Sequence, residues 1–158
     1  MFSVQLPFNK FLSLHAKFFP METSRIIYTG DLRTEATHVK SGQTFVTDAP
    51  VDNQGKGEAF SPTDLLATSL GACAITTVGI AAQTHGFDVD GTTIKVTKIM
   101  ASDPRRVGEV IVEMYFPEVK YSEKEKAIIR NTVNTCPVAK SLSPDLKQTI
   151  VLNFHEVG

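Results

Sequence analysis

The sequence predicts an α+β domain, and three observations support this class. Segments typical of strands and of helices fall in separate blocks: three strands, a helix, two strands, two helices and a strand. One apolar segment, residues 61–86, has the composition of a central helix. No internal repeat or low-complexity segment interrupts this order, so residues 21–158 are expected to form one domain.

The first strands lie before residue 50. The segment SRIIYTG is rich in β-branched and aromatic residues and predicts a strand that ends at Gly30. The segments TEATHVK and QTFVTDA flank Ser41 and Gly42, which predicts a hairpin with its turn at these two residues. Residues 50–60 are mainly Asp, Asn, Gly, Gln and Lys, and this composition predicts a loop.

The central helix is expected to begin after Ser61. Ser61 can cap the helix, Pro62 suits its first position, and Asp64 can complete a capping box. The helix is expected to run to about Thr84 and to stop at Gly86. Its residues are apolar or small nearly all round, so we expect it to be buried, wrapped by the sheet or by a partner subunit.

The remaining elements follow from similar patterns. TTIKVTKIMA and EVIVEMYF predict two strands joined by a turn near DPRRVG. Ser122 and Glu125 form a second capping box, which opens a helix that runs to about Asn134. Pro137 suits the first turn of a short third helix that ends near Ser143. QTIVLNF predicts the last strand and completes the sheets, which we expect to be antiparallel.

Composition limits the expected partners and location. The net charge of -1 gives no general electrostatic reason to expect nucleic acid or an acidic membrane. No apolar run reaches the roughly 20 residues that a membrane helix needs. Two cysteines are too few for the disulfide scaffold of a small secreted domain. We therefore expect a cytoplasmic protein whose thiols are free for packing or chemistry.

The first 20 residues are aromatic and weakly basic. Pro7, Asn9 and Lys10 interrupt the apolar stretch that a secretory signal requires. We interpret residues 1–20 as an N-terminal extension, expected to be mobile, with Met21 beginning the folded domain. A targeting peptide is the alternative interpretation.

The two cysteines, Cys73 and Cys136, are candidates for chemistry. By position alone, Cys73 is most simply a buried core residue. Cys136 precedes Pro137 at a predicted helix start, where free N–H groups and the helix dipole stabilise a thiolate. If the two side chains meet, they form a dithiol in which one attacks and the other resolves. Arg33 is a candidate cation beside the thiol, although a solvated surface arginine is the commoner case.

A metal site is a competing use of the cysteines. His38 and His85 would join Cys73 and Cys136 as ligands, but none of the four is paired at the short spacings typical of zinc sites. The chain also has no phosphate-binding glycine loop and no G-x-S-x-G motif. We therefore expect neither a metal nor a cofactor.

Three motifs together resemble the OsmC/Ohr family of osmotically inducible and organic-hydroperoxide-resistance proteins. SPTDLLATSLGACAITTV resembles the family's cysteine-bearing central helix, and CPVAKS resembles its second cysteine motif. YTGDLRTEATH resembles its N-terminal strand pair, which carries an arginine. The resemblance extends from about Met21 to the C-terminus. It implies an intertwined α+β homodimer with two long central helices and an active site in each of two interface clefts.

The resemblance also implies a function, the thiol-dependent reduction of small organic hydroperoxides in oxidative or osmotic stress defence. Cys73 would be the peroxidatic thiol, Cys136 the resolving thiol, and Arg33 would hold Cys73 as thiolate and orient the peroxide. A dithiol reductant, such as a lipoylated protein, would reset the disulfide. Two alternatives stay open: a non-enzymatic dimer that binds a small apolar ligand in the same cleft, and metal binding through Cys and His.

One position departs from the hydroperoxide-resistance branch of the family. That branch orients its arginine with a glutamate in the turn before the helix, and the matching residue here is Thr63. Asp64 is rotated from it by about 100° on a helix and is better placed for capping. Glu58, in the preceding loop, is the other candidate supporting acid. The chain therefore resembles the broader OsmC-like group more than the Ohr branch.

Overall fold

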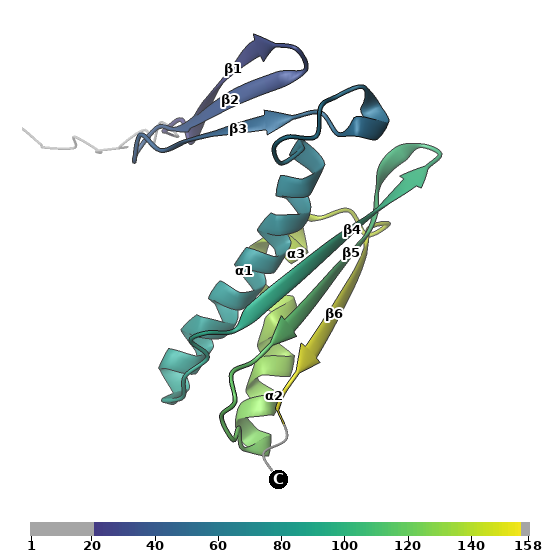
Figure 1. The fold of residues 1–158 in the computed structure, drawn as a ribbon. Coiled ribbons are helices and arrows are strands. Elements are labelled where there is room, and N and C mark those ends of the chain that lie inside the picture. Colours follow the sequence, from purple (N-terminus) through teal and green to yellow (C-terminus); the bar gives the residue numbers. More distant parts are fainter. Residues whose placement is uncertain (1–20, 156–158) are drawn as a thin grey trace, which may run out of the picture.

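The computed structural model describes residues 21–155. The extension 1–20, which we expect to be mobile, lies outside the described residues. The described residues form two three-stranded sheets and three α-helices in the predicted order, which confirms the α+β class. Figure 1 shows that one sheet stands beyond the N-terminal end of the longest helix, whereas the other lies along that helix.

The N-terminal sheet is antiparallel. It consists of β1 (Ser24–Gly30), β2 (Arg33–His38) and β3 (Thr44–Asp48). The predicted hairpin is confirmed, with Gly42 at φ 72° in the turn between β2 and β3. Arg33 is the first residue of β2 and pairs across the sheet with Asp48.

The longest helix, α1 (Pro62–His85), begins and ends almost as predicted. The Asp64 N–H donates to Ser61 Oγ at 3.1 Å, and the Ser61 N–H donates to the Asp64 carboxylate at 2.8 Å. These two bonds form the predicted capping box. Gly86 ends the helix in the left-handed conformation, with φ 76°.

One side of α1 packs into the core of this chain, so burial of the whole helix, by the sheet or by a partner subunit, stays a prediction. The buried residues follow a spacing of three or four and are Ala67, Leu70, Gly71, Ala74, Val78 and Ala82. A Cβ atom on Gly71 would lie 2.8 Å from Val96 Cγ2, so glycine allows the close approach of α1 to the sheet. The opposite side of α1 stays open to solvent, with Ile80 61% exposed.

By length and composition, α1 is the one helix within residues 21–155 that could cross a membrane. The expectation that no apolar segment is long enough is therefore wrong. Core helices of soluble proteins also meet this criterion, so the absence of a membrane partner stays a prediction.

The second sheet lies against α1 (Figure 1). It consists of β4 (Thr93–Ser102), β5 (Arg105–Tyr115) and β6 (Lys147–Asn153). β4 and β5 are antiparallel, whereas β6 runs parallel to β5, which corrects the expectation of antiparallel sheets. The physical reason is the connection: the chain crosses over through helices between β5 and β6, as a parallel pair requires.

The connection between β5 and β6 supplies the remaining helices. They are α2 (Glu123–Thr132), the 3-10 turn η2 (Val133–Thr135) and α3 (Pro137–Ser141). The predicted capping box of Ser122 and Glu125 opens α2, and Pro137 begins α3. Residues of η2 and α3 join the core beside α1, and this packing determines where the second cysteine lies.

Candidate functional site

The two cysteines lie together in the core. Cys73 lies halfway along α1, and Cys136 is the N-cap residue of α3. Both thiols are free; Cys136 is fully buried, whereas Cys73 is half-buried. The Cys73 side chain packs against the core cluster that contains Cys136, near enough for its thiol to affect the pKa of Cys136. The fold therefore forms the dithiol that the sequence left conditional.

Burial raises the pKa of the Cys136 thiol above its ordinary value. The Ala139 N–H donates to Cys136 Sγ at 3.3 Å and opposes this rise, whereas the neighbouring Cys73 thiol adds to it. The helix-start effect that the sequence predicts is present, but burial outweighs it. Cys136 is therefore protonated at neutral pH.

Arg33 lies in a different cluster, before the start of α1. Its Nη2 donates to Asp48 Oδ2 at 3.2 Å and also to the Glu58 carboxylate. The Asp48 side chain is 0% exposed and the Glu58 side chain 62% exposed. The structure thus pairs Glu58, one of the two candidate acids, with Arg33. It adds Asp48, which the sequence analysis missed.

Asp48 also organises the loop that carries Glu58. Its Oδ2 accepts the Glu58 N–H at 3.0 Å. This bond, together with Arg33, stabilises the carboxylate against burial and holds the pKa of Asp48 below its ordinary value. The contacts with Glu58 and Asp48 raise the pKa of Arg33, which stays charged.

Within one chain, the Arg33 cluster and Cys73 are far apart. Arg33 is bonded to Glu58, which precedes α1, whereas Cys73 follows Ser61 by more than three helical turns. At a rise of about 1.5 Å per residue, the helix separates its start from Cys73 by about 18 Å. The structure therefore brings the cysteines together, but it does not bring Arg33 to them.

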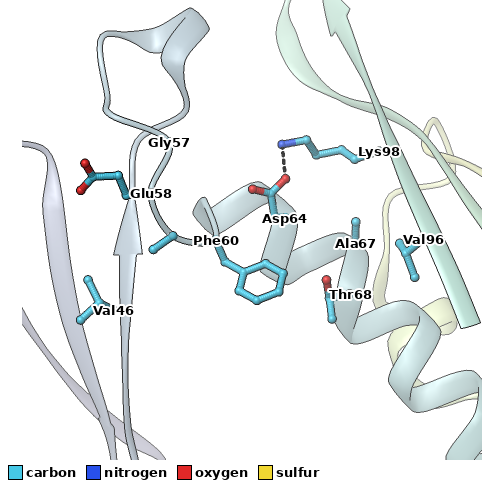
Figure 2. Close-up of a pocket in the computed structure, with 10 residues that line it drawn as sticks. Val46, Gly57, Glu58, Phe60, Asp64, Ala67, Thr68, Val96 and Lys98 are labelled. Carbon is cyan, nitrogen blue, oxygen red and sulfur yellow. Dashed lines mark ion pairs between the residues drawn. The ribbon is translucent and has the colours of Figure 1, made fainter.

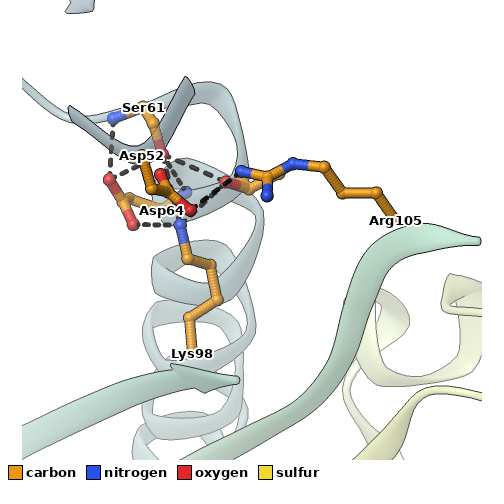
Figure 3. Close-up of polar contacts among 6 residues, drawn as sticks. Asp52, Ser61, Asp64, Lys98 and Arg105 are labelled. Atoms are coloured by element: carbon orange, nitrogen blue, oxygen red, sulfur yellow. Dashed lines mark hydrogen bonds and ion pairs between the residues drawn. The ribbon is translucent and has the colours of Figure 1, made fainter. Parts of the chain in front are cut away.

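Asp64, the other candidate acid, belongs to a third cluster (Figure 3). Its Oδ1 forms an ion pair with Lys98 Nζ at 2.7 Å, and Lys98 also donates to Thr63 Oγ1 at 2.8 Å. Burial raises the pKa of Asp64, but Lys98 and Ser61 outweigh it and hold that pKa below its ordinary value. Asp64 therefore caps α1 and pairs with Lys98, with no contact to Arg33.

The loop before α1 is tied to the second sheet. It contains the 3-10 turn η1 (Val51–Asn53), where a loop is predicted. Arg105, at the start of β5, donates to Asp52 Oδ2 at 3.1 Å (Figure 3). This contact joins the segment that carries Glu58 to the β4–β5 hairpin.

A pocket of about 580 Å³ opens between β3, the start of α1 and β4 (Figure 2). Its lining combines apolar walls with a charged end and consists of Val46, Gly57, Glu58, Ala59, Phe60, Asp64, Ala67, Thr68, Val96 and Lys98. Figure 2 shows Glu58 pointing away from the facing pair of Asp64 and Lys98. Neither cysteine lines this pocket.

His38 and His85, the two histidines considered as metal ligands, have other surroundings than the cysteines. His38 Nδ1 lies 2.7 Å from the Ser41 hydroxyl, and His85 is in the last turn of α1. Within residues 21–155, no group of three or more His, Cys, Asp or Glu side chains is arranged to hold a metal ion.

Comparisons with known proteins extend this description. A family model for OsmC-like proteins matches residues 55–151. The chain is 53% identical to an osmotic stress induced and detoxification response protein from Psychrobacter arcticus 273-4, whose crystal structure superposes with a TM-score of 0.82. That similarity covers 87% of this chain and 99% of the other.

More distant structures share the fold. An organic hydroperoxide resistance protein OsmC from Legionella pneumophila is 12% identical, with a TM-score of 0.67 over 84% of this chain and 98% of that one. An OsmC-like protein from Mycoplasma pneumoniae is 19% identical, with a TM-score of 0.65 over 84% and 96%. A search of curated proteins gave no match.

Proposed function

The chain belongs to the OsmC-like protein family, and on that basis we propose that it reduces organic hydroperoxides with its two cysteines in oxidative or osmotic stress defence. The observation that carries the proposal is the proximity of Cys73 on α1 to Cys136 at the start of α3, within one core cluster. The description of the Psychrobacter relative as a stress and detoxification protein supports it.

The proposed reaction transfers two electrons to the O–O bond. The Cys73 thiolate attacks the terminal peroxide oxygen, the O–O bond breaks, and the alkoxide takes a proton and leaves as an alcohol. Cys73 is then a sulfenic acid. The Cys136 sulfur attacks the Cys73 sulfur, water leaves, and a disulfide remains. A dithiol reductant, such as a lipoylated protein, restores both thiols and becomes a disulfide itself.

The raised pKa of Cys136 suits the resolving role. A protonated thiol is a poor nucleophile, so Cys136 does not compete for the peroxide. It lies beside Cys73, so it needs no large movement to reach the sulfenic acid. Cys73, half-buried next to it, is the thiol that a small peroxide can approach.

We further propose that the active form is a homodimer in which Arg33 of one subunit serves Cys73 of the other. Within a chain, Arg33 lies in the cluster before α1, and about 18 Å of helix separates the start of α1 from Cys73. The N-terminal sheet exposes Ile26 and Phe45, and the outer side of α1 exposes Ile80. A second copy of the chain would cover this apolar surface and bring an arginine to the cysteines.

Titration with cumene hydroperoxide tests the function. One equivalent should consume both thiols and yield a Cys73–Cys136 disulfide in mass spectrometry, and dihydrolipoamide should restore them. Cys73→Ser should abolish turnover, whereas Cys136→Ser should trap an oxidised Cys73. Two thiols still titratable after stoichiometric peroxide would refute the proposal.

The pocket beside Phe60 favours a second candidate function, the non-enzymatic binding of a small apolar ligand. Its apolar walls include Val46 and Val96, and it lies apart from the cysteines. This function predicts a Cys73 thiol with an ordinary pKa of about 8.5 and slow oxidation. It also predicts that an apolar fluorescent probe binds equally well to the wild type and to Cys73→Ser.

A further inference from the structure

We propose that Asp48 is the positioning residue that fixes Arg33 for the reaction, and that Glu58 is an exchangeable second partner. This inference rests on the proposed function, in which Arg33 acts beside Cys73. Asp48 itself touches neither thiol. It acts through Arg33.

The two carboxylates that hold Arg33 differ in their surroundings. Asp48 is fully buried, and its backbone is fixed because it pairs directly with Arg33 across β2 and β3. Glu58 lies in the loop before α1 and its side chain is mostly exposed. An exposed ion pair is weak and exchanges with water, whereas a buried carboxylate that loses its cation is strongly destabilised. Asp48 is therefore the partner that Arg33 keeps.

The same carboxylate oxygen also fixes the exchangeable partner. Asp48 Oδ2 accepts both the Arg33 Nη2–H and the Glu58 N–H, at 3.2 and 3.0 Å. The Gly57 N–H donates to the Ala49 carbonyl at 3.3 Å, which closes the loop back onto the end of β3. The backbone of Glu58 is thus held at Asp48, while its side chain is free to leave Arg33.

Among the residues that the structure describes, two atoms of this cluster have no hydrogen-bond partner. They are Arg33 Nε and Asp48 Oδ1, and both are buried. A guanidinium fork can bind a carboxylate through two parallel bonds, and only one of them is formed here. If Glu58 releases Arg33, a rotation of the guanidinium lets Nε and Oδ1 form the second bond. Asp48 can therefore hold Arg33 in both arrangements, and Glu58 in only one.

A positioning role for Asp48 and a purely electrostatic role predict opposite changes in the pKa of Cys73 for Asp48→Asn. Removing a negative charge near Arg33 would make the site more positive and lower the pKa of Cys73. Loss of the anchor would let Arg33 leave, which raises the pKa of Cys73 and slows the reaction. For Glu58→Gln, the anchor remains and one negative charge is removed, so the pKa of Cys73 should fall or stay the same.

The experiment uses the full-length protein with Cys136→Ser, so that Cys73 is the sole thiol. The rate of iodoacetamide alkylation against pH gives the pKa of Cys73. We expect Asp48→Asn to raise this pKa by about 1, and Arg33→Ala to raise it too. In the protein that retains Cys136, Asp48→Asn should lower kcat/KM for cumene hydroperoxide about tenfold. Glu109→Gln is the matched control, because Glu109 pairs with Lys147 at 2.9 Å on the second sheet. It should change neither quantity.

A lowered or unchanged pKa in Asp48→Asn, while Arg33→Ala raises it, would overturn the inference and leave the proposed function intact. No effect of Arg33→Ala on Cys73 would overturn it too. If peroxide fails to oxidise the wild type but the alkylation profiles follow the expected order, the function fails and the positioning role stands.

A second measurement covers the case in which Asp48→Asn does not fold. In ¹⁵N NMR spectra of Glu58→Gln, the Arg33 side-chain N–H signals should persist as in the wild type, because Asp48 still holds the guanidinium. Loss of these signals would identify Glu58 as the anchor and overturn the inference.

Discussion

The two sheets of this chain differ in how completely one subunit covers them. The β4–β6 sheet packs against α1 and encloses fully buried side chains, among them Leu70, Val78, Val110 and Val112. The β1–β3 sheet has few buried residues and exposes Ile26, Ile27, Tyr28 and Phe45. The first region forms a core by itself, whereas the second leaves apolar side chains exposed, and we propose that a second copy of the chain covers them. The cysteines belong to the first region and Arg33 to the second, so the proposed site needs both.

The largest effect on stability is expected in the self-sufficient core. Leu70 is fully buried on α1, so Leu70→Ala should lower the free energy of unfolding by about 2–5 kcal/mol. Ile80→Ala, on the exposed side of the same helix, is the matched control. Urea denaturation at a concentration where the chain is monomeric should show a much smaller loss for Ile80→Ala. Equal losses would contradict the difference between the two sides of α1.

The next effect concerns the exposed sheet. Phe45→Asp places a charge on the apolar surface that we expect a second copy to cover, and it should weaken dimerisation by about 3 kcal/mol. Sedimentation velocity should show a shift from dimer to monomer, with unchanged helix content by circular dichroism. Lys40→Asp, in the turn between β2 and β3, is the control and should stay dimeric. A Phe45→Asp protein that remains dimeric would show that this sheet is not the interface.

The smallest effect is expected at the helix start that joins the two regions. The pKa of Asp64 is lowered in the folded chain, so its stabilisation is present above its unfolded pKa of about 3.9 and is lost as the pH falls through the lower folded value. Asp64→Asn should therefore lower the Tm at pH 7. The loss in the free energy of unfolding should be about 1 kcal/mol or less, because the pair is partly solvated.

That difference from the wild type should shrink below pH 4 as Asp64 is protonated. Asp52→Asn removes the exposed partner of Arg105 and serves as the control. A Tm difference for Asp64→Asn that is the same at pH 2.5 and pH 7 would show that the charge of Asp64 does not matter.

Features that depend on local chemistry could be predicted from the sequence. Ser61 with Asp64, and Ser122 with Glu125, open helices because a capping box involves only residues three apart. The left-handed stop at Gly86 is equally local. Two cysteine motifs and an arginine motif also indicated the family, which the family model and the Psychrobacter relative confirm.

Features that depend on tertiary pairing could not be predicted from the sequence. The direction of β6 is decided by the crossover from β5, and the composition of α1 does not say which side is covered. Asp48 meets Arg33 only because the β2–β3 turn spans residues 39–43, a length that the Ser41-Gly42 signal does not specify. Lys98 looks like a solvent-facing strand residue, yet its long side chain reaches Thr63 and Asp64 at the start of α1.

Subunit complementation tests most directly whether the two regions form one site across a dimer. Cys73→Ser and Arg33→Ala should each be inactive as homodimers. If Arg33 serves the cysteine of the partner subunit, a mixed dimer of the two variants has one intact site and one doubly altered site. Refolding an equal mixture should therefore restore about a quarter of the wild-type peroxide reduction, since half the dimers are mixed. A mixture in which mixed dimers form but no activity returns would contradict a site shared between subunits.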